Sequence, residues 1–188
     1  MKRVFTIVAL SGAFLTAAAA TDLGANPDAP FRFLDGSIWY VPVETLPAAA
    51  MDLTNGKVLP LVDQTVWEIA GYRDGYFWGR SIASFTIPGI ATPQVECSRM
   101  LGSVTPDGRV LISFVADNQQ NASGAVSGIG TLFRHSPRGW RFQMQMATGA
   151  TSITAHWSFM DQCRKNEPCA SKLPGSKLSL RQFLAQCG

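Results

Sequence analysis

The chain has 188 residues, of which 46% are hydrophobic and only 15% are charged. This composition excludes an intrinsically disordered protein, because such chains have few apolar residues and a high net charge. The formal net charge of +3 is too small to hold a nucleic acid by bulk charge alone. The length suits one hydrophobic core, and we expect a single domain.

Residues 1–20 have the layout of a secretory signal peptide. The second and third residues are basic, an apolar run covers residues 4–15, and small alanines follow up to Ala20. The apolar run is shorter than the roughly 20 residues that a membrane span needs. We therefore expect cleavage after Ala20 and a mature domain over residues 21–188, secreted or periplasmic, with 14 basic residues against 13 acidic ones.

The first part of the mature chain combines a strand, a turn of helix and a hairpin. Residues 36–41 are apolar and predict a first strand, whereas residues 44–50 have room for one helical turn. Asn55 and Gly56 then separate two short apolar runs. Asn-Gly is the strongest short hairpin signal and favours a type I′ turn, in which both residues have positive φ.

Three further hairpins and a last strand follow. Each pair of apolar, β-branched and aromatic runs is joined by a short turn containing glycine, and the polar stretch 117–124 reads as a loop between two hairpins. Regular strands at this spacing predict an all-β fold, an antiparallel up-and-down β-barrel or meander of about eight strands. The expected strands are 64–72 with 76–86, 94–104 with 109–116, 126–134 with 140–147, and 151–160.

A short helix is expected at the C-terminus. Ser179 and Gln182 have the spacing of a capping box, and the apolar positions that follow recur at i, i+3, i+4 and i+7. Such a stripe packs on a sheet. The apolar positions are Leu180, Phe183, Leu184 and Cys187.

Four cysteines follow the expected signal peptide, and in an oxidising compartment they predict two disulfides. Three pairings are possible. We favour Cys97–Cys163 with Cys169–Cys187, slightly above Cys163–Cys169 with Cys97–Cys187. Their spacing matches no metal site, so we expect no metal.

Side chains alternate between the two faces of a strand, and the second hairpin has large apolar groups on both faces. Val66 lies on one face of the first strand, with Trp67 and Ile69 on the other. Two layers must cover such strands: the barrel interior on one side, and the C-terminal helix or a partner subunit on the other. Gly128 and Gly130 within a later strand indicate a bulge or close packing.

The layout resembles that of the lipocalins. The resemblance rests on Gly36 and Trp39 near the first strand, on the series of hairpins and on a C-terminal helix held by disulfides. Lipocalins usually have Gly-x-Trp, and this chain has one residue more. The late arginine that covers the tryptophan in that family corresponds to Arg164 or Arg141. The resemblance implies a barrel that binds a small apolar ligand.

The aromatic and methionine side chains of the strands suit an apolar or aromatic small molecule. They either line a cavity or fill the barrel. We expect Glu68 and Arg80 to pair across the second hairpin and anchor a polar head group, unless these charges point to solvent. The apolar lining is expected from Trp67, Tyr76, Trp78, Met144 and Trp157.

Two other functions fit the same fold. One is an isomerase, cyclase or lyase that uses no cofactor, with Glu68 or His156 as the acid or base, although an exposed histidine is the commoner use of such a position. The other is a protein-interaction factor with a filled barrel and an exposed apolar patch. The sequence leaves the choice, and the oligomeric state, open.

Overall fold

The computed structural model describes residues 30–117, 126–136, 139–149 and 152–188. The expected signal peptide and residues 118–124 of the expected polar loop lie outside these ranges. No helix in the described part of the chain has the length and apolar character needed to span a bilayer.

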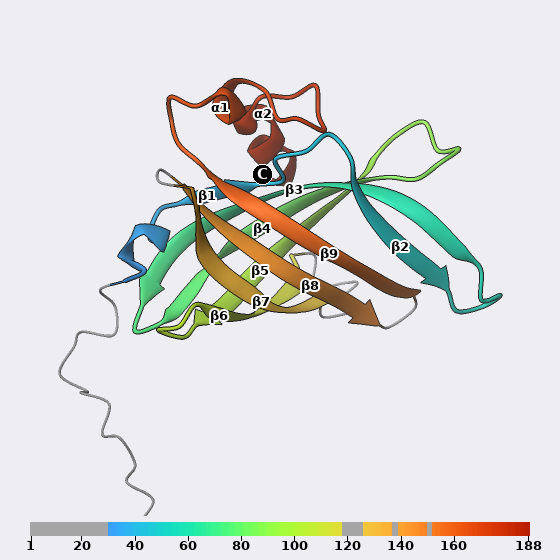
Figure 1. The fold of residues 1–188 in the computed structure, drawn as a ribbon. Coiled ribbons are helices and arrows are strands. Elements are labelled where there is room, and N and C mark those ends of the chain that lie inside the picture. The colour runs from blue at the N-terminus through green and yellow to red at the C-terminus, as the bar shows by residue number, and fades with distance from the viewer. Residues whose placement is uncertain (1–29, 118–125, 137–138, 150–151) are drawn as a thin grey trace, which may run out of the picture.

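The strands form a closed, antiparallel, eight-stranded β-barrel, as expected from the hairpin series (Figure 1). Two short strands, β1 and β2, together occupy one of the eight strand positions in the barrel, between β3 and β9, because each pairs with both of these strands. The pairing of β3 with β4 completes the ring. The strands are β1 (Ile38–Tyr40), β2 (Leu46–Asp52), β3 (Val58–Arg73), β4 (Tyr76–Thr86), β5 (Gln94–Val104), β6 (Arg109–Ala116), β7 (Val126–Ser136), β8 (Gly139–Gly149) and β9 (Ser152–Cys163).

The expected helical turn at residues 44–50 is wrong, because residues 46–50 belong to strand β2. Its alanines favour a helix locally. Strand β3 is 16 residues long, however, and its first residues form backbone hydrogen bonds with β2 along the length of the segment. Leu46 and Ala48 alternate with exposed residues and point into the barrel.

The hairpin at Asn55 and Gly56 is confirmed, but its turn is not type I′. Only Gly56 has a positive φ, of 68°. The turn is instead held by Asp52, whose carboxylate accepts bonds from the backbone N–H and the hydroxyl of Thr54 at 2.8 and 2.6 Å. Two successive positive φ values occur one turn later, at Asp74 and Gly75 between β3 and β4.

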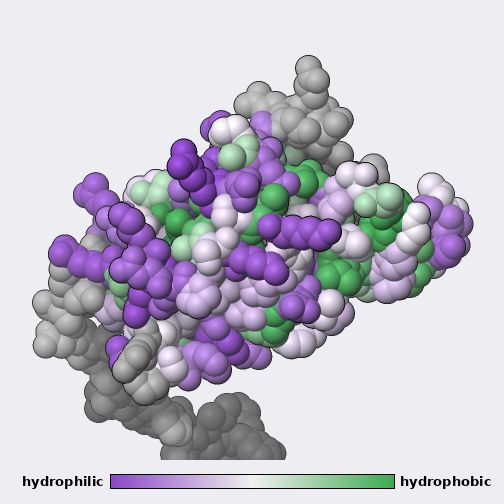
Figure 2. Space-filling view, turned by 90° about the horizontal axis from the view of Figure 1, so that it is seen from above, coloured by the Kyte–Doolittle hydropathy of each residue, from purple (hydrophilic) through white to green (hydrophobic). Residues whose placement is uncertain are grey.

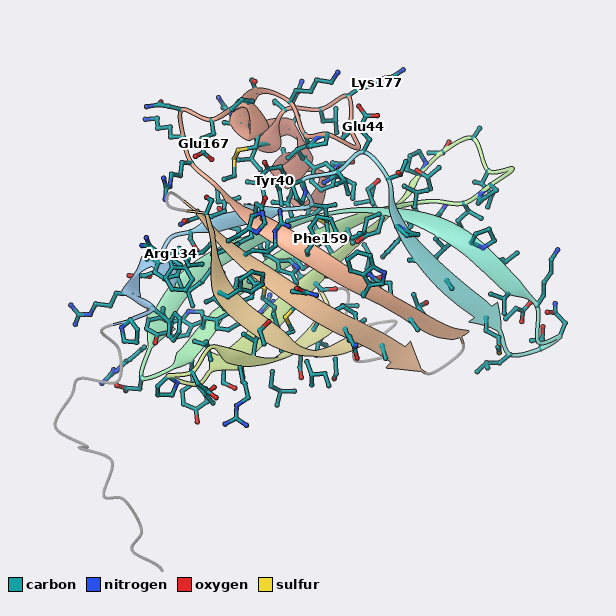
Figure 3. The ribbon with its side chains drawn as sticks, viewed as in Figure 1. Tyr40, Glu44, Arg134, Phe159, Glu167 and Lys177 are labelled. Atoms are coloured by element: carbon teal, nitrogen blue, oxygen red, sulfur yellow. A yellow bond between two sulfur atoms is a disulfide. The ribbon has the colours of Figure 1, made fainter. Side chains whose placement is uncertain are left out.

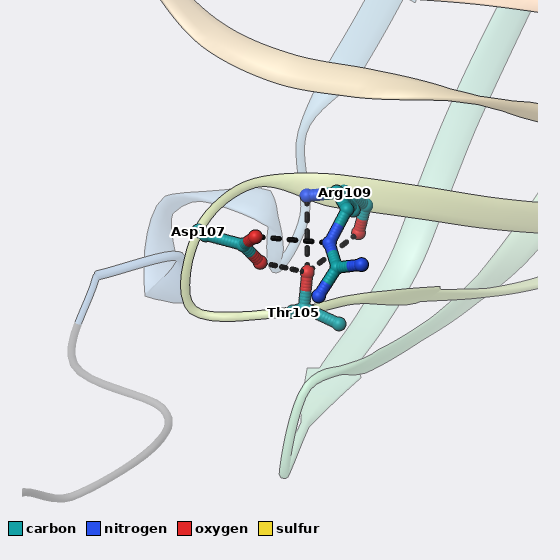
Figure 4. A network of polar contacts seen from close by, with 3 residues as sticks. All are labelled: Thr105, Asp107 and Arg109. Carbon is teal, nitrogen blue, oxygen red and sulfur yellow. Dashed lines mark hydrogen bonds and ion pairs between the residues drawn. The ribbon is translucent and has the colours of Figure 1, made fainter. Parts of the chain in front are cut away.

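The third hairpin is confirmed and has a polar network at its turn (Figure 4). The Thr105 hydroxyl donates to Asp107 at 2.5 Å, and the Arg109 guanidinium donates to the same carboxylate at 2.9 Å. The bond from Thr105 is the main reason why the pKa of Asp107 lies below its usual value.

One end of the barrel is filled by aromatic side chains. The 3-10 helix η1 (Arg32–Leu34), blue in Figure 1, lies at this end. Trp39 is fully buried, 4.5 Å from the ring of Phe142, and its indole N–H donates to Ser37 at 2.8 Å. We call this the closed end. Its largest buried side chains are Leu34, Trp39, Ile69, Phe77 and Phe142.

Residues 164–188 form a cap on the outside of the barrel, which Figure 1 shows in red beside β1 and β3. The cap contains α1 (Pro168–Ser171), α2 (Leu180–Leu184) and η3 (Ala185–Cys187). The expected capping box is present, with Ser179 accepting from the backbone N–H of Gln182. The expected packing on the sheet is also present. The cluster between cap and sheet contains Val66, Ile82, Cys163, Cys169, Leu173, Leu180 and Phe183.

Two disulfides tie the cap to the barrel, and the pairing that we favoured is wrong. The structure has the second alternative, Cys97–Cys187 and Cys163–Cys169, with Cα–Cα distances of 5.7 and 6.0 Å. Cys97 pairs with Ile82 across β4 and β5, and the side chain of Ile82 lies under the cap. The chain therefore brings its last turn, not the end of β9, to Cys97.

Close packing explains the two glycines of β7. A Cβ at Gly130 would collide with the carbonyl oxygen of Gln143, and one at Gly128 would collide with the sulfur of Met146. The expectation of close packing is confirmed, and it lets two large methionines point into the barrel.

Candidate functional site

A cavity of about 60 Å³ lies inside the barrel, away from the closed end. Its walls combine aromatic and sulfur-containing side chains with a carboxyl group, an imidazole and several hydroxyls. Their apolar members include Trp67, Phe85, Phe114, Met146 and Met160, and their polar members are Asp63, Thr65, Ser81, Glu96, Ser98, His156 and Ser158.

Strand register brings the polar groups together. On β3, residues at odd positions face inward, so Asp63 and Thr65 precede Trp67 on one inner row. Ser81 of β4 pairs with Trp67 on one side and with Ser98 of β5 on the other. Three neighbouring strands therefore place the Asp63 carboxyl and the hydroxyls of Thr65, Ser81 and Ser98 on the same wall.

Asp63 is the most buried ionisable group of this cavity, with 1% of its surface exposed. The Thr65 hydroxyl donates to its Oδ1 at 2.7 Å. Burial raises the pKa of Asp63 from 3.8 to about 7, against the opposing effect of the Thr65 bond. No lysine or arginine is among the described residues that line the cavity.

His156 of β9 lines the same cavity as Asp63, and one of its ring nitrogens is shielded from solvent. Its Nδ1 is buried and has no hydrogen-bond partner among the described residues. Burial lowers the pKa of His156 below 6.5, so the ring is neutral at pH 7. A neutral imidazole can accept a hydrogen bond from a bound molecule.

A second hollow of about 190 Å³ adjoins the cavity on the side away from the closed end. The two share five lining residues, and we call the second hollow the entrance. The residues that line only the entrance are mostly apolar, and none of them is charged. The shared residues are Phe85, Glu96, Val126, Met146 and His156, and the entrance adds Leu61, Ile87, Gln94, Ala147 and Thr154.

Of the site residues expected from the sequence, Trp67 and His156 line the cavity, while Met144 is buried in the core beside it. Tyr76, Trp78 and Trp157 lie on the outer surface, with 57%, 43% and 51% of their areas exposed.

Glu68 and Arg80 form the expected cross-strand pair, with Arg80 Nε 2.5 Å from a Glu68 oxygen. The pair lies on the outer face, where Arg80 also donates to the carbonyl oxygen of Gly188 at 3.3 Å. It therefore stands beside the cap and not in the cavity.

An open groove of about 960 Å³ separates parts of the cap from the barrel. Arg80, Lys165 and Arg181 are among its lining residues. Figure 2, which looks down on the cap, shows hydrophilic side chains over much of this face. Tyr40 lies beneath the cap near Glu167 (Figure 3), and its pKa is raised by burial and then by Asp161 and Glu167.

Exposed apolar side chains also cross the outer surface of β5 to β9. Leu111 and Ile129 are direct cross-strand neighbours and are more than half exposed. The described residues thus form both a cavity inside the barrel and an exposed apolar band on its outer surface. The exposed residues of this band include Leu101, Leu111, Val115, Ile129 and Trp157.

Sequence reasoning missed Asp63, Ser81, Ser98 and Ser158. Asp63 had a recognisable pattern, because it lies two and four residues before Thr65 and Trp67 on one face of an apolar run. The serines had none, since a serine in a strand is as compatible with the outer face as with the inner one. Comparisons with known protein families, with curated proteins and with solved structures returned no match.

Buried Asp63 predicts a stability that falls as the pH rises. Below about pH 4 the carboxyl is protonated in both states. Between about pH 4 and 7 the unfolded chain loses this proton while the folded chain keeps it, so the free energy of unfolding decreases by up to about 1.4 kcal/mol per pH unit. Asp63→Asn is expected to remove this slope in urea titrations at several pH values. The exposed Asp35→Asn serves as control, and equal slopes in both variants would contradict the assignment.

Proposed function

We propose that this protein is an exported binding protein that takes a small molecule through the open end of its barrel. The observation that carries the proposal is the difference between the two ends: one is filled by Trp39 and its neighbours, and the other holds a cavity with hydrogen-bonding groups. The sequence of residues 1–20 and the two disulfides support an oxidising, extracytoplasmic location.

The dimensions limit the ligand. Pockets for drug-sized molecules measure about 300–1,000 Å³, and a cavity of about 150 Å³ holds benzene. The inner cavity of 60 Å³ accommodates a polar head group, and the entrance of 190 Å³ a body of about one ring. Leu61, Phe85 and Ile87 offer apolar contacts to that body.

A lipocalin-like mode of binding belongs to this proposal. It is supported by the closed barrel and by a first-strand tryptophan buried at one end. Of the two arginines that the resemblance offers, Arg141 and Arg164, Arg141 has another partner: it makes two hydrogen bonds to Asp161, at 2.6 and 2.8 Å, and its guanidinium lies over the ring of Phe159.

Trp67 allows a direct test, because its ring lines the cavity. Titration with one-ring amines, alcohols and acids is expected to change the tryptophan fluorescence of the wild type and of Trp157→Phe, but to leave Trp67→Phe nearly silent. Ala83→Leu, which fills the cavity, should weaken binding at least tenfold, whereas Ala155→Leu on the outer surface should not. A silent wild type, confirmed by calorimetry across the whole panel, would refute the proposal.

A cofactor-independent isomerase, cyclase or lyase is the second candidate. The observation that favours it is that Asp63, with a pKa of about 7, shares the inner cavity with His156, whose pKa is lowered by burial. A group with that pKa both gives and takes protons near neutral pH. Chemical change of a bound ligand, followed by NMR, distinguishes this candidate from simple binding.

A further inference from the structure

We propose, on the basis of the binding function above, that the ligand carries a positively charged amine and that this group binds the carboxylate of Asp63. The inference names the chemical class of the ligand's head group. It rests on the charges of the cavity, on its hydrogen-bonding groups and on the state of the buried carboxyl.

The charges of the cavity favour a cation. Asp63 and Glu96 contribute two carboxyl groups, and among the described lining residues of cavity and entrance there is no lysine or arginine. His156, the third titratable group that faces the cavity, is neutral at pH 7. A carboxylate or phosphate head group would find no lysine or arginine among these described lining residues to balance its charge.

The hydrogen-bonding groups suit the same head group. An ammonium has three N–H donors and no acceptor. The cavity offers acceptors: the Asp63 carboxyl, which receives one bond from Thr65, the unpartnered Nδ1 of His156, and the hydroxyls of Ser98 and Ser158. An anion needs donors, and the described lining residues supply only uncharged ones: the hydroxyls, one ring N–H of His156 and the protonated form of Asp63.

A bound cation also removes the reason why Asp63 holds its proton. In the free protein the carboxyl is buried without a positive partner, so its neutral form persists to about pH 7. When an ammonium binds, the carboxyl ionises, its proton passes to the solvent, and the O–H bond is replaced by an N–H···O bond to the ligand. Affinity therefore rises with pH up to the pKa of Asp63 and levels off above it.

Three ligands with the same ring test this assignment: 2-phenylethylamine, 2-phenylethanol and 3-phenylpropionate. In calorimetry with the full mature chain, the amine is expected to bind at least tenfold more tightly than the alcohol, and the acid most weakly. Amine binding should strengthen about tenfold from pH 6 to pH 8. At pH 6 it should release close to one proton, measured in buffers of different ionisation enthalpy.

Asp63→Asn should lose both the preference for the amine and the proton release, whereas Asp35→Asn, an exposed carboxylate that lines neither the cavity nor the entrance, should keep them. Binding of all three ligands with equal affinity, or best binding of the acid, overturns the amine assignment and leaves the proposed function intact. Absence of binding by every ligand in the wild type overturns the proposed function itself. The pH and proton-release measurements use the wild type, so they decide the question even if Asp63→Asn does not fold.

Discussion

Replacing Cys97 and Cys187 together by serine is expected to lower the free energy of unfolding by about 4–5 kcal/mol. The two cysteines are 90 residues apart, so their bond removes a large amount of conformational freedom from the unfolded chain. The bond also fixes the last turn of the cap to β5, over the apolar outer face of Val66 and Ile82. Guanidinium unfolding followed by circular dichroism measures the change.

The second disulfide supplies the matched control. Cys163 and Cys169 are only six residues apart, and their replacement by serine should cost about 2 kcal/mol in the same loop-closure treatment. A reducing agent should reproduce the sum of both effects in the wild type. Equal losses from the two double variants would show that loop length does not govern the contribution of these bonds. A stable domain without either bond would remove one argument for an oxidising compartment.

Trp39→Ala is expected to destabilise the protein by about 3–5 kcal/mol, as large-to-small changes of buried aromatic residues do. Trp39 is fully buried, and its ring centroid lies 4.5 Å from Phe142 and 6.5 Å from Phe33. Removing the indole leaves a cavity at the closed end and removes the N–H donor to Ser37. Urea unfolding with a fixed m-value measures the loss.

Trp39→Phe, which keeps most of the ring volume, should be milder than Trp39→Ala, and Trp157→Ala on the outer surface should cost about 1 kcal/mol or less. Trp39 does not line the cavity, so the ligand affinity of Trp39→Phe should stay within about twofold of the wild-type value. A small effect of Trp39→Ala on stability would mean that the closed end is not densely packed. A large effect of Trp39→Phe on affinity would mean that the two ends of the barrel are not independent.

Some parts of this protein are determined by local sequence. The hairpins at residues 73–76 and 104–109 follow from glycine turns between runs of β-forming side chains, and they form where the pattern predicts. The start of α2 follows from the capping box of Ser179 and Gln182. Each of these features depends on contacts between residues that are close in the chain, and such contacts can be predicted from the sequence.

The residues of the candidate site are harder to predict from the sequence. Period-two alternation divides β3 into two faces, one with Asp63, Thr65 and Trp67 and one with Glu68, but both faces are rich in apolar residues. The sequence therefore predicts the pairing of Glu68 with Arg80 and does not show that this pair lies outside the barrel. Ring closure by β3 and β4, together with the cap over Val66, decides which face is interior.

The sequence by itself determined the strands, most turns, the C-terminal helix and the need for two covering layers, because these depend on short-range periodicity. Only the tertiary structure decided that the alanine-rich segment 46–52 is a strand, that Cys97 bonds Cys187, and that Asp63 and His156 face one cavity. These features depend on segments that are far apart in the sequence, by 90 residues in the case of Cys97 and Cys187, and that meet only when the barrel closes. When the barrel closes, one face of every strand becomes the interior at the same time, and no local sequence pattern predicts which face this is.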